Sequence, residues 1–333
     1  MSSQNFKAMV VSKTEDGEFT REIATRPIDS LPAGEVLLNV KYSSLNYKDA
    51  LSAVGNRGVT RNYPHTPGVD AAGIVEHSES GEFQPGDKVI VHGYDLGMDT
   101  SGGFGQYVRV PADWVVNLPA GLDLKESMMY GTAGFTAAQS VLRIVEGGVR
   151  SEDGKILVTG ATGGVGSMAV AVLAKAGYSV TASTGKTAQE QFLGGLGAEE
   201  IIGREDLTDP SGRLLLKGQW AGVVDTVGGE MLATAIKSTR QRGVVTTCGN
   251  VASHELNTNV YPFILRGITL AGIDSASCPM ERRRFVWEKM SAEWKLDILE
   301  QMCKTVCLED LDPEIDVILK GGQVGRVVVD LWN

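Results

Sequence analysis

The chain reads KILVTGATGGVG from Lys155 to Gly166. This apolar strand and glycine-rich turn lead into a helical stretch rich in Ala and Val, which is the order of a dinucleotide fingerprint. Ala161 stands at the first glycine position of that fingerprint, while Gly163 and Gly166 keep the other two. A turn without side chains lets a pyrophosphate approach the N–H groups at a helix start. The stretch therefore predicts a dinucleotide site at Thr162, Gly163, Gly164 and Val165; a tight turn without a ligand is the alternative.

Five more apolar runs follow this strand, and helical stretches separate them. They read YSVTAS, AEEIIG, AGVVDTVGG, GVVTTCGN and GITLAGID, and the last ends at Asp274. Six strands joined by crossovers predict an α/β fold with a Rossmann-type, doubly wound parallel sheet.

The end of the second of these strands indicates which dinucleotide is bound. A carboxylate there would hold the ribose 2′-hydroxyl of NADH, but this chain has Thr184, Gly185 and Lys186, with no acid until Glu190. A hydroxyl and a cation suit a 2′-phosphate, and Arg204 can add a second charge. The sequence predicts NADPH; a solvated surface lysine is the alternative for Lys186.

The first 120 residues or so have a different pattern, made of short β segments divided by Gly and Pro. The segments read KAMVVS, EVLLNVKYSSL, DAAGIVEHS, DKVIVHG and GQYVRVPADWVVNLP. They predict an irregular, barrel-like β domain. The last apolar run, GRVVVDLW, has no partner among the six parallel strands, so we assign it to this domain.

The domain boundaries follow from these patterns. We expect a catalytic β domain over 1–124, completed by 299–333, and an NADPH-binding domain over 125–298. The segment MMYGTAGFTAAQSVLRIVEGG has helical periodicity and would bridge them. A charged helical region, ERRRFVWEKMSAEWKLDILEQMCK, precedes the last strand.

The composition of the chain argues against some classes of binding partner and indicates where the protein is located. A formal charge of -10 and a pI near 5.0 argue against binding to nucleic acid or to an anionic membrane, because both need a positive field. No apolar run reaches the roughly 20 residues that cross a bilayer, and the start resembles neither a signal nor a transit peptide, so we expect a cytoplasmic protein. Cys303 and Cys307, four apart in an expected helix, are interpreted as packing residues rather than metal ligands.

The order of β domain, GTAGFTAA helix and GATGGVG turn resembles the medium-chain dehydrogenase/reductase superfamily over essentially the whole chain. Six segments narrow the resemblance to the quinone-oxidoreductase-like branch that contains NADPH-dependent acrylyl-CoA reductases. They are SSLNYKDAL (43–51), PGVDAAG (67–73), GTAGFTAA (131–138), VDTVGG (224–229), PFILRG (262–267) and GIDS (272–275). The resemblance implies a GroES-like fold for the β domain.

The same resemblance indicates a reaction without zinc. Zinc alcohol dehydrogenases of this superfamily take catalytic ligands from an early cysteine and from a Gly-His-Glu segment. The corresponding segments here, 45–49 and 68–70, contain neither Cys nor His, and the structural-zinc cysteine quartet is absent. We therefore expect no metal and a hydride transfer to a carbon activated by conjugation.

Asn46 and Tyr47 are the candidate catalytic residues. A protonated phenol can donate a hydrogen bond or a proton, and the Asn46 amide can donate to a developing oxyanion. The resemblance also implies that Tyr47 contacts the nicotinamide end of the cofactor, which would require no proton transfer. The alternative is a strand-to-helix junction in which Tyr47 is a core residue and Asp49 caps the helix.

Further contacts are implied by the resemblance alone. Asn250, Phe263 and Leu265 match positions around the nicotinamide, and Arg326 could reach the cofactor. A turn, a buried apolar run and a surface ion pair are the respective alternatives. Arg282 and Arg284, in the densest basic run, could hold the phosphates of a CoA ester; a solvated helix face is the alternative.

The residues predict an NADPH-dependent reductase without zinc. The resemblance implies that it reduces the C=C bond of an α,β-unsaturated acyl-CoA, acrylyl-CoA to propionyl-CoA. Reduction of a quinone or simple enone is a second possibility, and a noncatalytic NADPH-binding protein is a third. We expect small-molecule substrates. The resemblance implies a homodimer formed through an edge of the nucleotide-binding sheet near 267–273; a buried last strand is the alternative reading of that segment.

Overall fold

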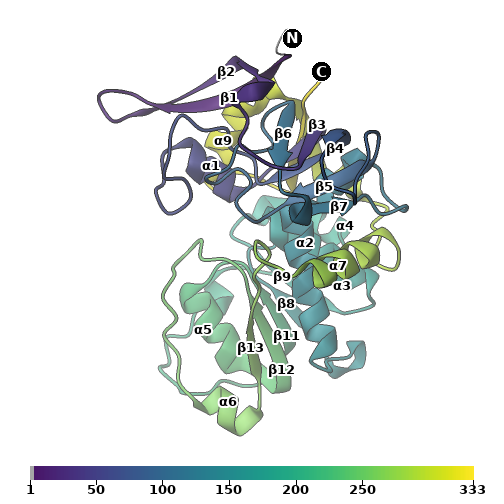
Figure 1. Cartoon of the computed structure of the whole chain (residues 1–333). Coiled ribbons are helices and arrows are strands. Elements are labelled where there is room, and N and C mark those ends of the chain that lie inside the picture. The colour runs from purple at the N-terminus through teal and green to yellow at the C-terminus, as the bar shows by residue number, and fades with distance from the viewer. Residues whose placement is uncertain (1–3) are drawn as a thin grey trace. The chain divides into compact units, whose positions relative to one another are not determined.

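The sheet predicted around the glycine turn is present in the computed structural model, which describes residues 4–333 (Figure 1). Its six parallel strands are β8 (Ile156–Val158), β9 (Val180–Ser183), β10 (Glu200–Ile202), β11 (Trp220–Asp225), β12 (Thr239–Thr247) and β13 (Thr269–Gly272). Their spatial order is β10-β9-β8-β11-β12-β13. The first strand lies inside the sheet and the order reverses beside it, which is the doubly wound arrangement. The predicted fold class is confirmed.

Helices join these strands. They are α3 (Gly164–Lys175), α4 (Glu190–Gly195), α5 (Gly229–Ser238) and α6 (Tyr261–Arg266), and α2 (Leu124–Glu146) comes before the first strand. β8, β9 and β11 are buried over their whole length, which explains why their sequences are continuous apolar runs.

The second sheet has seven strands. They are β3 (Val36–Leu45), β4 (Asp70–Ser78), β5 (Lys88–His92), β6 (Tyr107–Val110), β7 (Val115–Asn117), β14 (Cys303–Cys307) and β15 (Arg326–Asp330). Their order is β14-β15-β3-β4-β5-β7, with β6 also paired to β3. The last strand therefore joins the N-terminal β region as predicted, since β15 pairs antiparallel with β3.

The remaining elements are one β hairpin, four helices and several short 3-10 turns. A separate hairpin consists of β1 (Asn5–Lys13) and β2 (Phe19–Pro27). The helices are α1 (Tyr47–Ala53), α7 (Met280–Ser291), α8 (Leu299–Met302) and α9 (Leu311–Leu319). Short 3-10 turns lie at 28–30, 112–114, 151–153, 187–189, 205–207 and 308–310.

Two features of the C-terminal region differ from the sequence expectation. The expected helix over 281–304 ends at Ser291, and Cys303–Cys307 is strand β14, paired in parallel with β15. The helix predicted for the two cysteines is therefore wrong. Their spacing of four still places both on one face, because strand side chains alternate with period two.

The chain divides into two compact units. Unit 1 contains Met1–Thr132, Ala276–Ala292 and Leu299–Asn333, and unit 2 contains Ala133–Ser275 and Glu293–Ile298. The segment 276–292 groups with unit 1, whereas the sequence placed it in the nucleotide-binding domain. The assignment of a catalytic and an NADPH-binding domain stays a prediction. Among residues 4–333, no helix is both long and apolar enough to cross a membrane.

Candidate active site

The glycine turn has the backbone geometry that the fingerprint requires. Gly160 has φ +60, in the left-handed region, and a Cβ there would lie 2.4 Å from Thr226 Oγ1. Gly166 packs so closely that a Cβ would lie 2.3 Å from the Gly160 carbonyl oxygen. Gly163 precedes the first residue of α3 in extended conformation, so the helix start opens onto the turn. A cradle that side chains would fill, at a helix N-terminus, fits a dinucleotide pyrophosphate.

A buried carboxylate supports this turn from β11. Asp225 is fully buried and accepts hydrogen bonds from Thr159 Oγ1 at 2.7 Å and from the Gly228 N–H at 2.9 Å. Thr226 Oγ1 donates to the Thr159 carbonyl at 2.9 Å, just before the turn. Burial raises the pKa of Asp225, and the hydrogen bonds act against that rise. The network fixes the strand ends from which the turn begins.

The residues predicted to recognise a 2′-phosphate lie together in unit 2. The two hydroxyl oxygens of Thr162 and Thr184 are 3.3 Å apart, and the Lys186 N–H donates to Thr184 Oγ1 at 3.0 Å. Arg204 lies over Gly185, where a Cβ would be 2.3 Å from Arg204 Nε. Burial, and then the charge of Arg204, lower the pKa of Lys186. Two cations held near each other provide the charge that a dianionic phosphate binds.

Three more predicted cofactor contacts also belong to unit 2. Asn250 is exposed and follows β12, while Phe263 of α6 is half-buried against the apolar core of this sheet. Leu265 is 59% exposed, so it is not part of a buried apolar run. Their contact with a cofactor stays a prediction.

In unit 1, the dominant polar feature is a carboxylate at the start of β4. Asp70 is fully buried and accepts hydrogen bonds from Ser44 Oγ, from Asn46 Nδ2 at 2.7 Å and from Thr132 Oγ1 at 2.6 Å. The Thr132 N–H also donates to it at 3.0 Å. Burying a charge is costly unless it is paired or hydrogen-bonded, so these donors are what allow an acid here.

Arg326 supplies a positive charge to the same cluster. Its side chain is 1% exposed, with NH2 3.9 Å from Asp70 Oδ2 and 2.7 Å from Ser44 Oγ. NH1 donates to Asn46 Oδ1 at 3.2 Å and to the Leu45 carbonyl at 3.1 Å. Burial lowers the pKa of Arg326, and the charge of Asp70 opposes that effect. This placement favours a positioning role, while its contact with the cofactor stays a prediction.

Gly131 lets the chain approach this cluster. Its φ of +51 interrupts α2, and a Cβ would lie 2.5 Å from Ser44 Oγ, 2.6 Å from Asp70 Oδ2 and 2.8 Å from Arg326 NH2. Only glycine combines that backbone conformation with the available space.

Asp49 is a second buried acid, in the first turn of α1. Its carboxylate accepts from the Asn46 N–H at 2.8 Å and from the Val69 N–H at 2.8 Å. Burial, and then the charge of Asp70, raise the pKa of Asp49 to about 7 despite these bonds. Asp49 therefore exchanges its proton near neutral pH and ties α1 to the segment before β4.

Asn46 and Tyr47, the two predicted catalytic residues, differ in whether their polar groups already make hydrogen bonds within the chain. The Asn46 amide nitrogen has acceptors on Asp70, on Asp49 at 3.3 Å and on the Ser44 carbonyl at 3.2 Å. Tyr47, the first residue of α1, is 42% exposed, and its hydroxyl has no hydrogen-bond partner within the described chain. Tyr47 is not a core residue, so that alternative is wrong, whereas Asp49 does cap the helix.

The basic run on α7 is not uniform. Arg284 is exposed and Arg282 half-buried, but Arg283 between them is fully buried. Arg283 donates to the carbonyls of His92 at 2.6 Å and Ala276 at 3.0 Å. Arg283 therefore does not lie on a solvated helix face. The contact of Arg282 and Arg284 with CoA stays a prediction.

Sequence reasoning missed the polar partners of Asn46 and Arg326. Asp70 and Thr132 fall in PGVDAAG and GTAGFTAA, two segments that the sequence analysis uses only for comparison with a known family. Asp49 is interpreted there only as a helix cap. An acid opening an otherwise apolar strand was the available signal. Among residues 4–333, no three His, Cys, Asp or Glu side chains gather as a metal ion would need.

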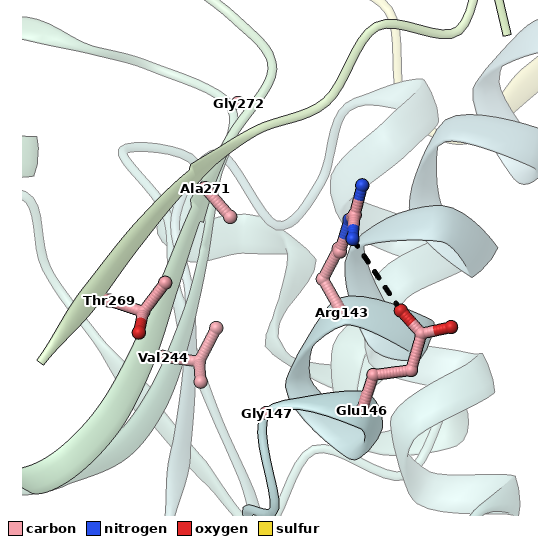
Figure 2. A pocket seen from close by; sticks show the side chains of 7 residues that line it. All are labelled: Arg143, Glu146, Gly147, Val244, Thr269, Ala271 and Gly272. Atoms are coloured by element: carbon pink, nitrogen blue, oxygen red, sulfur yellow. Dashed lines mark ion pairs between the residues drawn. The ribbon is translucent and has the colours of Figure 1, made fainter.

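An open depression lies elsewhere, beside the edge strand β13 (Figure 2). Its volume is about 400 Å³, and Arg143, Glu146, Gly147, Val244, Thr269, Ala271 and Gly272 line it. It includes none of the predicted site residues, and the Arg143–Glu146 ion pair, at 3.7 Å, accounts for its charged groups.

Comparison with known proteins places these two units in one family. Residues 32–120 match the alcohol dehydrogenase GroES-like domain, and residues 164–292 match the zinc-binding dehydrogenase family. The acrylyl-CoA reductase AcuI of Ruegeria pomeroyi is 42% identical over 98% of this chain and 99% of its own length. The chain belongs to the medium-chain dehydrogenase/reductase superfamily. The predicted resemblance is confirmed, the protein is an oxidoreductase, and the noncatalytic alternative is set aside.

Other relatives carry different names and cofactors. The putative quinone oxidoreductase YhfP of Bacillus subtilis is 45% identical over 98% of this chain and 99% of its own length. The yhdH oxidoreductase of Salmonella enterica, solved in complex with NADP, has a TM-score of 0.95 and 38% identity, covering 98% of this chain and 99% of that one. YhfP, solved with NAD bound, has a TM-score of 0.96 and 44% identity, covering 99% and 100%. These relatives hold the class of cofactor that the glycine turn predicts.

The pKa of Asp49 predicts a pH dependence of stability. Its folded value of about 7 lies above the ordinary 3.8, so between these values the folded chain retains a proton that the unfolded chain has lost. The free energy of unfolding should therefore fall as pH rises through this window, by up to about 1.4 kcal/mol per pH unit. We expect Asp49→Asn to reduce that fall, as measured by urea unfolding across the window.

The exposed loop acid Asp16 provides the control, since Asp16→Asn should keep the wild-type slope. A constant offset between Asp49→Asn and wild type at every pH would contradict the assignment.

Proposed function

We propose that this enzyme reduces the C=C bond of an α,β-unsaturated acyl-CoA with NADPH, and that acrylyl-CoA is the first substrate to test. The near full-length similarity to AcuI proteins of two organisms, named an acrylyl-CoA reductase and a probable one, carries this proposal. The residue types at the zinc-ligand positions of the alcohol dehydrogenases support it, because 45–49 and 68–70 offer neither Cys nor His.

NADPH is the proposed cofactor, and residues of unit 2 would hold it. The cradle at Gly160, Gly163 and Gly166 would receive the pyrophosphate, and Thr184, Lys186 and Arg204 would receive the 2′-phosphate. When bound, NADPH supplies the hydride that reduces the activated double bond.

Tyr47 is the proposed proton donor or ligand contact. Its exposed hydroxyl has no partner within the described residues, so Oη can donate to a ligand without losing an existing bond. Asn46, by contrast, has its amide engaged by Asp70 and Arg326 at 2.7 and 3.2 Å. We assign Asn46, Asp70 and Arg326 the role of holding the start of α1, and with it Tyr47, in a fixed position.

The CoA portion would meet Arg282 and Arg284. Both lie on α7, where Arg284 is exposed and Arg282 is half-buried, whereas Arg283 between them is buried. Their guanidinium groups would bind phosphate oxygens, for which arginine geometry is well suited.

Reduction of a quinone or a simple enone is the second candidate, because YhfP is named a putative quinone oxidoreductase. That reaction would need the same cofactor residues and Tyr47, but no site for the CoA phosphates. The homodimer and the cytoplasmic location also remain proposals.

The cofactor assignment predicts selective loss of NADPH binding. Lys186→Gln and Arg204→Gln should each raise the KM for NADPH about tenfold, because each removes a charge-assisted contact to the 2′-phosphate. The KM for NADH should stay within about twofold in both variants. Lys175→Gln, which changes an exposed lysine at the end of α3, is the control. Equal losses for NADPH and NADH would reject a 2′-phosphate contact.

The substrate assignment is tested by steady-state kinetics with acrylyl-CoA, crotonyl-CoA, benzoquinone and methyl vinyl ketone. We expect acrylyl-CoA to have the highest kcat/KM. Reversal of Arg282 and Arg284 to Glu should raise the KM for acrylyl-CoA about tenfold while sparing methyl vinyl ketone. Lys289→Glu, a charge reversal on the same helix, is the control for the reversals of Arg282 and Arg284. A higher kcat/KM for benzoquinone would favour the second candidate, and equal effects on both substrates would remove the CoA role.

Tyr47→Phe separates proton transfer from positioning. Loss of a proton donor should lower kcat by about 100-fold or more with little change in the dissociation constant of NADPH. Loss of a positioning contact should instead weaken NADPH binding. Tyr42→Phe, at a half-buried tyrosine of β3, is the control. Wild-type values of both quantities for Tyr47→Phe would exclude either role.

A further inference from the structure

A large basic depression lies in unit 2, at the end of the parallel sheet where β11 and β12 begin. Its volume is about 1060 Å³. The residues that line it are Gly147, Gly148, Val149, Arg150, Asp153, Gly218, Ala221, Arg240, Gln241, Arg242, Gly243 and Arg266. Four arginines thus share one depression in a chain whose formal charge is -10.

Two of these arginines are held in place by main-chain oxygens. Arg266 NH1 donates to the carbonyls of Lys237 at 2.9 Å and Thr239 at 2.7 Å. Arg240 NH1 donates to the Asp153 carbonyl at 2.9 Å. Such bonds fix the guanidinium groups and leave their charge, because a carbonyl does not neutralise a cation.

Carboxylates do not neutralise most of this charge. Arg150 lies 3.3 Å from a Glu152 oxygen and 3.7 Å from an Asp153 oxygen, but Arg240, Arg242 and Arg266 make no ion pair with any residue in 4–333. The neighbouring depression in Figure 2 has the opposite arrangement, since its one arginine, Arg143, is paired with Glu146. Three arginines without an acidic partner therefore set this depression apart, although Asp153, the partner of Arg150, also lines it.

The backbone is also unusual at the same place. Strand β12 pairs with β11 at Thr239 and again from Val244, so residues 240–243 lie outside that ladder. Within this bulge Arg242 has φ +59, a left-handed conformation that costs free energy for a residue with a side chain. The Arg242 side chain is exposed and makes no hydrogen bond or ion pair within the described chain. A strained residue without a structural partner is a candidate for a function.

This depression is separate from the proposed cofactor turn. The turn follows the carboxyl end of β8, whereas the depression is lined by residues at or before the amino ends of β8, β11 and β12. The two places are at opposite ends of the same parallel sheet.

We propose that the depression binds a small anion with two or more linked phosphate groups. The three guanidinium groups without carboxylate partners match the three to four negative charges of a diphosphate. Arg242, which makes no bond within the described chain, can bind phosphate oxygens in pairs, while Arg240 and Arg266 add fixed charge. The diphosphate can be inorganic or part of a nucleotide. Its binding would be a second anion site, independent of the reducing cofactor.

The test is calorimetric titration of the whole protein, saturated with NADPH so that the glycine turn is blocked. The probes are inorganic pyrophosphate, orthophosphate and ADP. We expect pyrophosphate to bind at least about tenfold more tightly than orthophosphate, with affinity falling as salt is added. ADP binding equal to pyrophosphate would indicate that the linked phosphates alone are recognised, and tighter binding would indicate a nucleotide.

Variants locate the site. Arg242→Gln and Arg240→Gln should each weaken pyrophosphate binding about tenfold. Arg242→Gly should lose the same affinity while raising the Tm, because glycine adopts the left-handed conformation without strain. Arg213→Gln, at an exposed arginine of the same unit outside the depression, should bind as the wild type does. Absence of pyrophosphate binding, or wild-type affinity in both Arg240→Gln and Arg242→Gln, would overturn the proposal.

Discussion

The buried carboxylate of Asp70 is the constraint on which unit 1 depends. An acid without solvent must be compensated, and the chain brings donors from the end of β3, from the interruption in α2 and from the start of β15 to do so. These segments are far apart in sequence, so one charge determines how a strand end, a helix turn and the C-terminal strand meet. The same donors hold Asn46, and Asn46 begins the helix on which Tyr47 is exposed. The Tyr47 hydroxyl, the proposed proton donor or ligand contact, is therefore positioned by a network that it does not itself join.

The sequence predicted the structural elements that depend mainly on residues close together in the chain. Six apolar runs became the six parallel strands, and the glycine turn formed where side-chain-free positions allowed the close approach of Gly166 to Gly160. It failed where pairing with a neighbouring strand, rather than an apolar pattern, determines the structure. Strand β2 reads FTREIATRP and has no fully buried residue, so it lacks the apolar signal of its partner β1. Cys303–Cys307 looked helical because its neighbours are charged and helical, yet pairing with β15 determines its structure.

Buried charges were the least visible feature in the sequence. Asp49, Asp70, Arg283 and Arg326 are all inaccessible, and nothing in residue type distinguishes them from surface charges. Arg283 even lies between two surface-accessible arginines in one run, and only the helix face separates their roles. Lys186 and Arg204, the proposed cofactor cations, follow strand ends at a position that the fold itself specifies. Their contact with a 2′-phosphate stays a prediction.

The interruption of α2 at Gly131 has a consequence for the register of that helix. Thr132 is tied to Asp70 through both its N–H and its hydroxyl, so the rotation of the next turns is fixed from their first residue. The helix then presents Phe135, Val141 and Ile144 to fully buried positions. Residues 133–142 of α2 are all buried. Because each residue advances an α-helix by about 100°, a single inserted residue after Thr132 would rotate all of these side chains away from their present packing neighbours. The buried acid Asp70 therefore fixes the residue at which the second part of α2 begins.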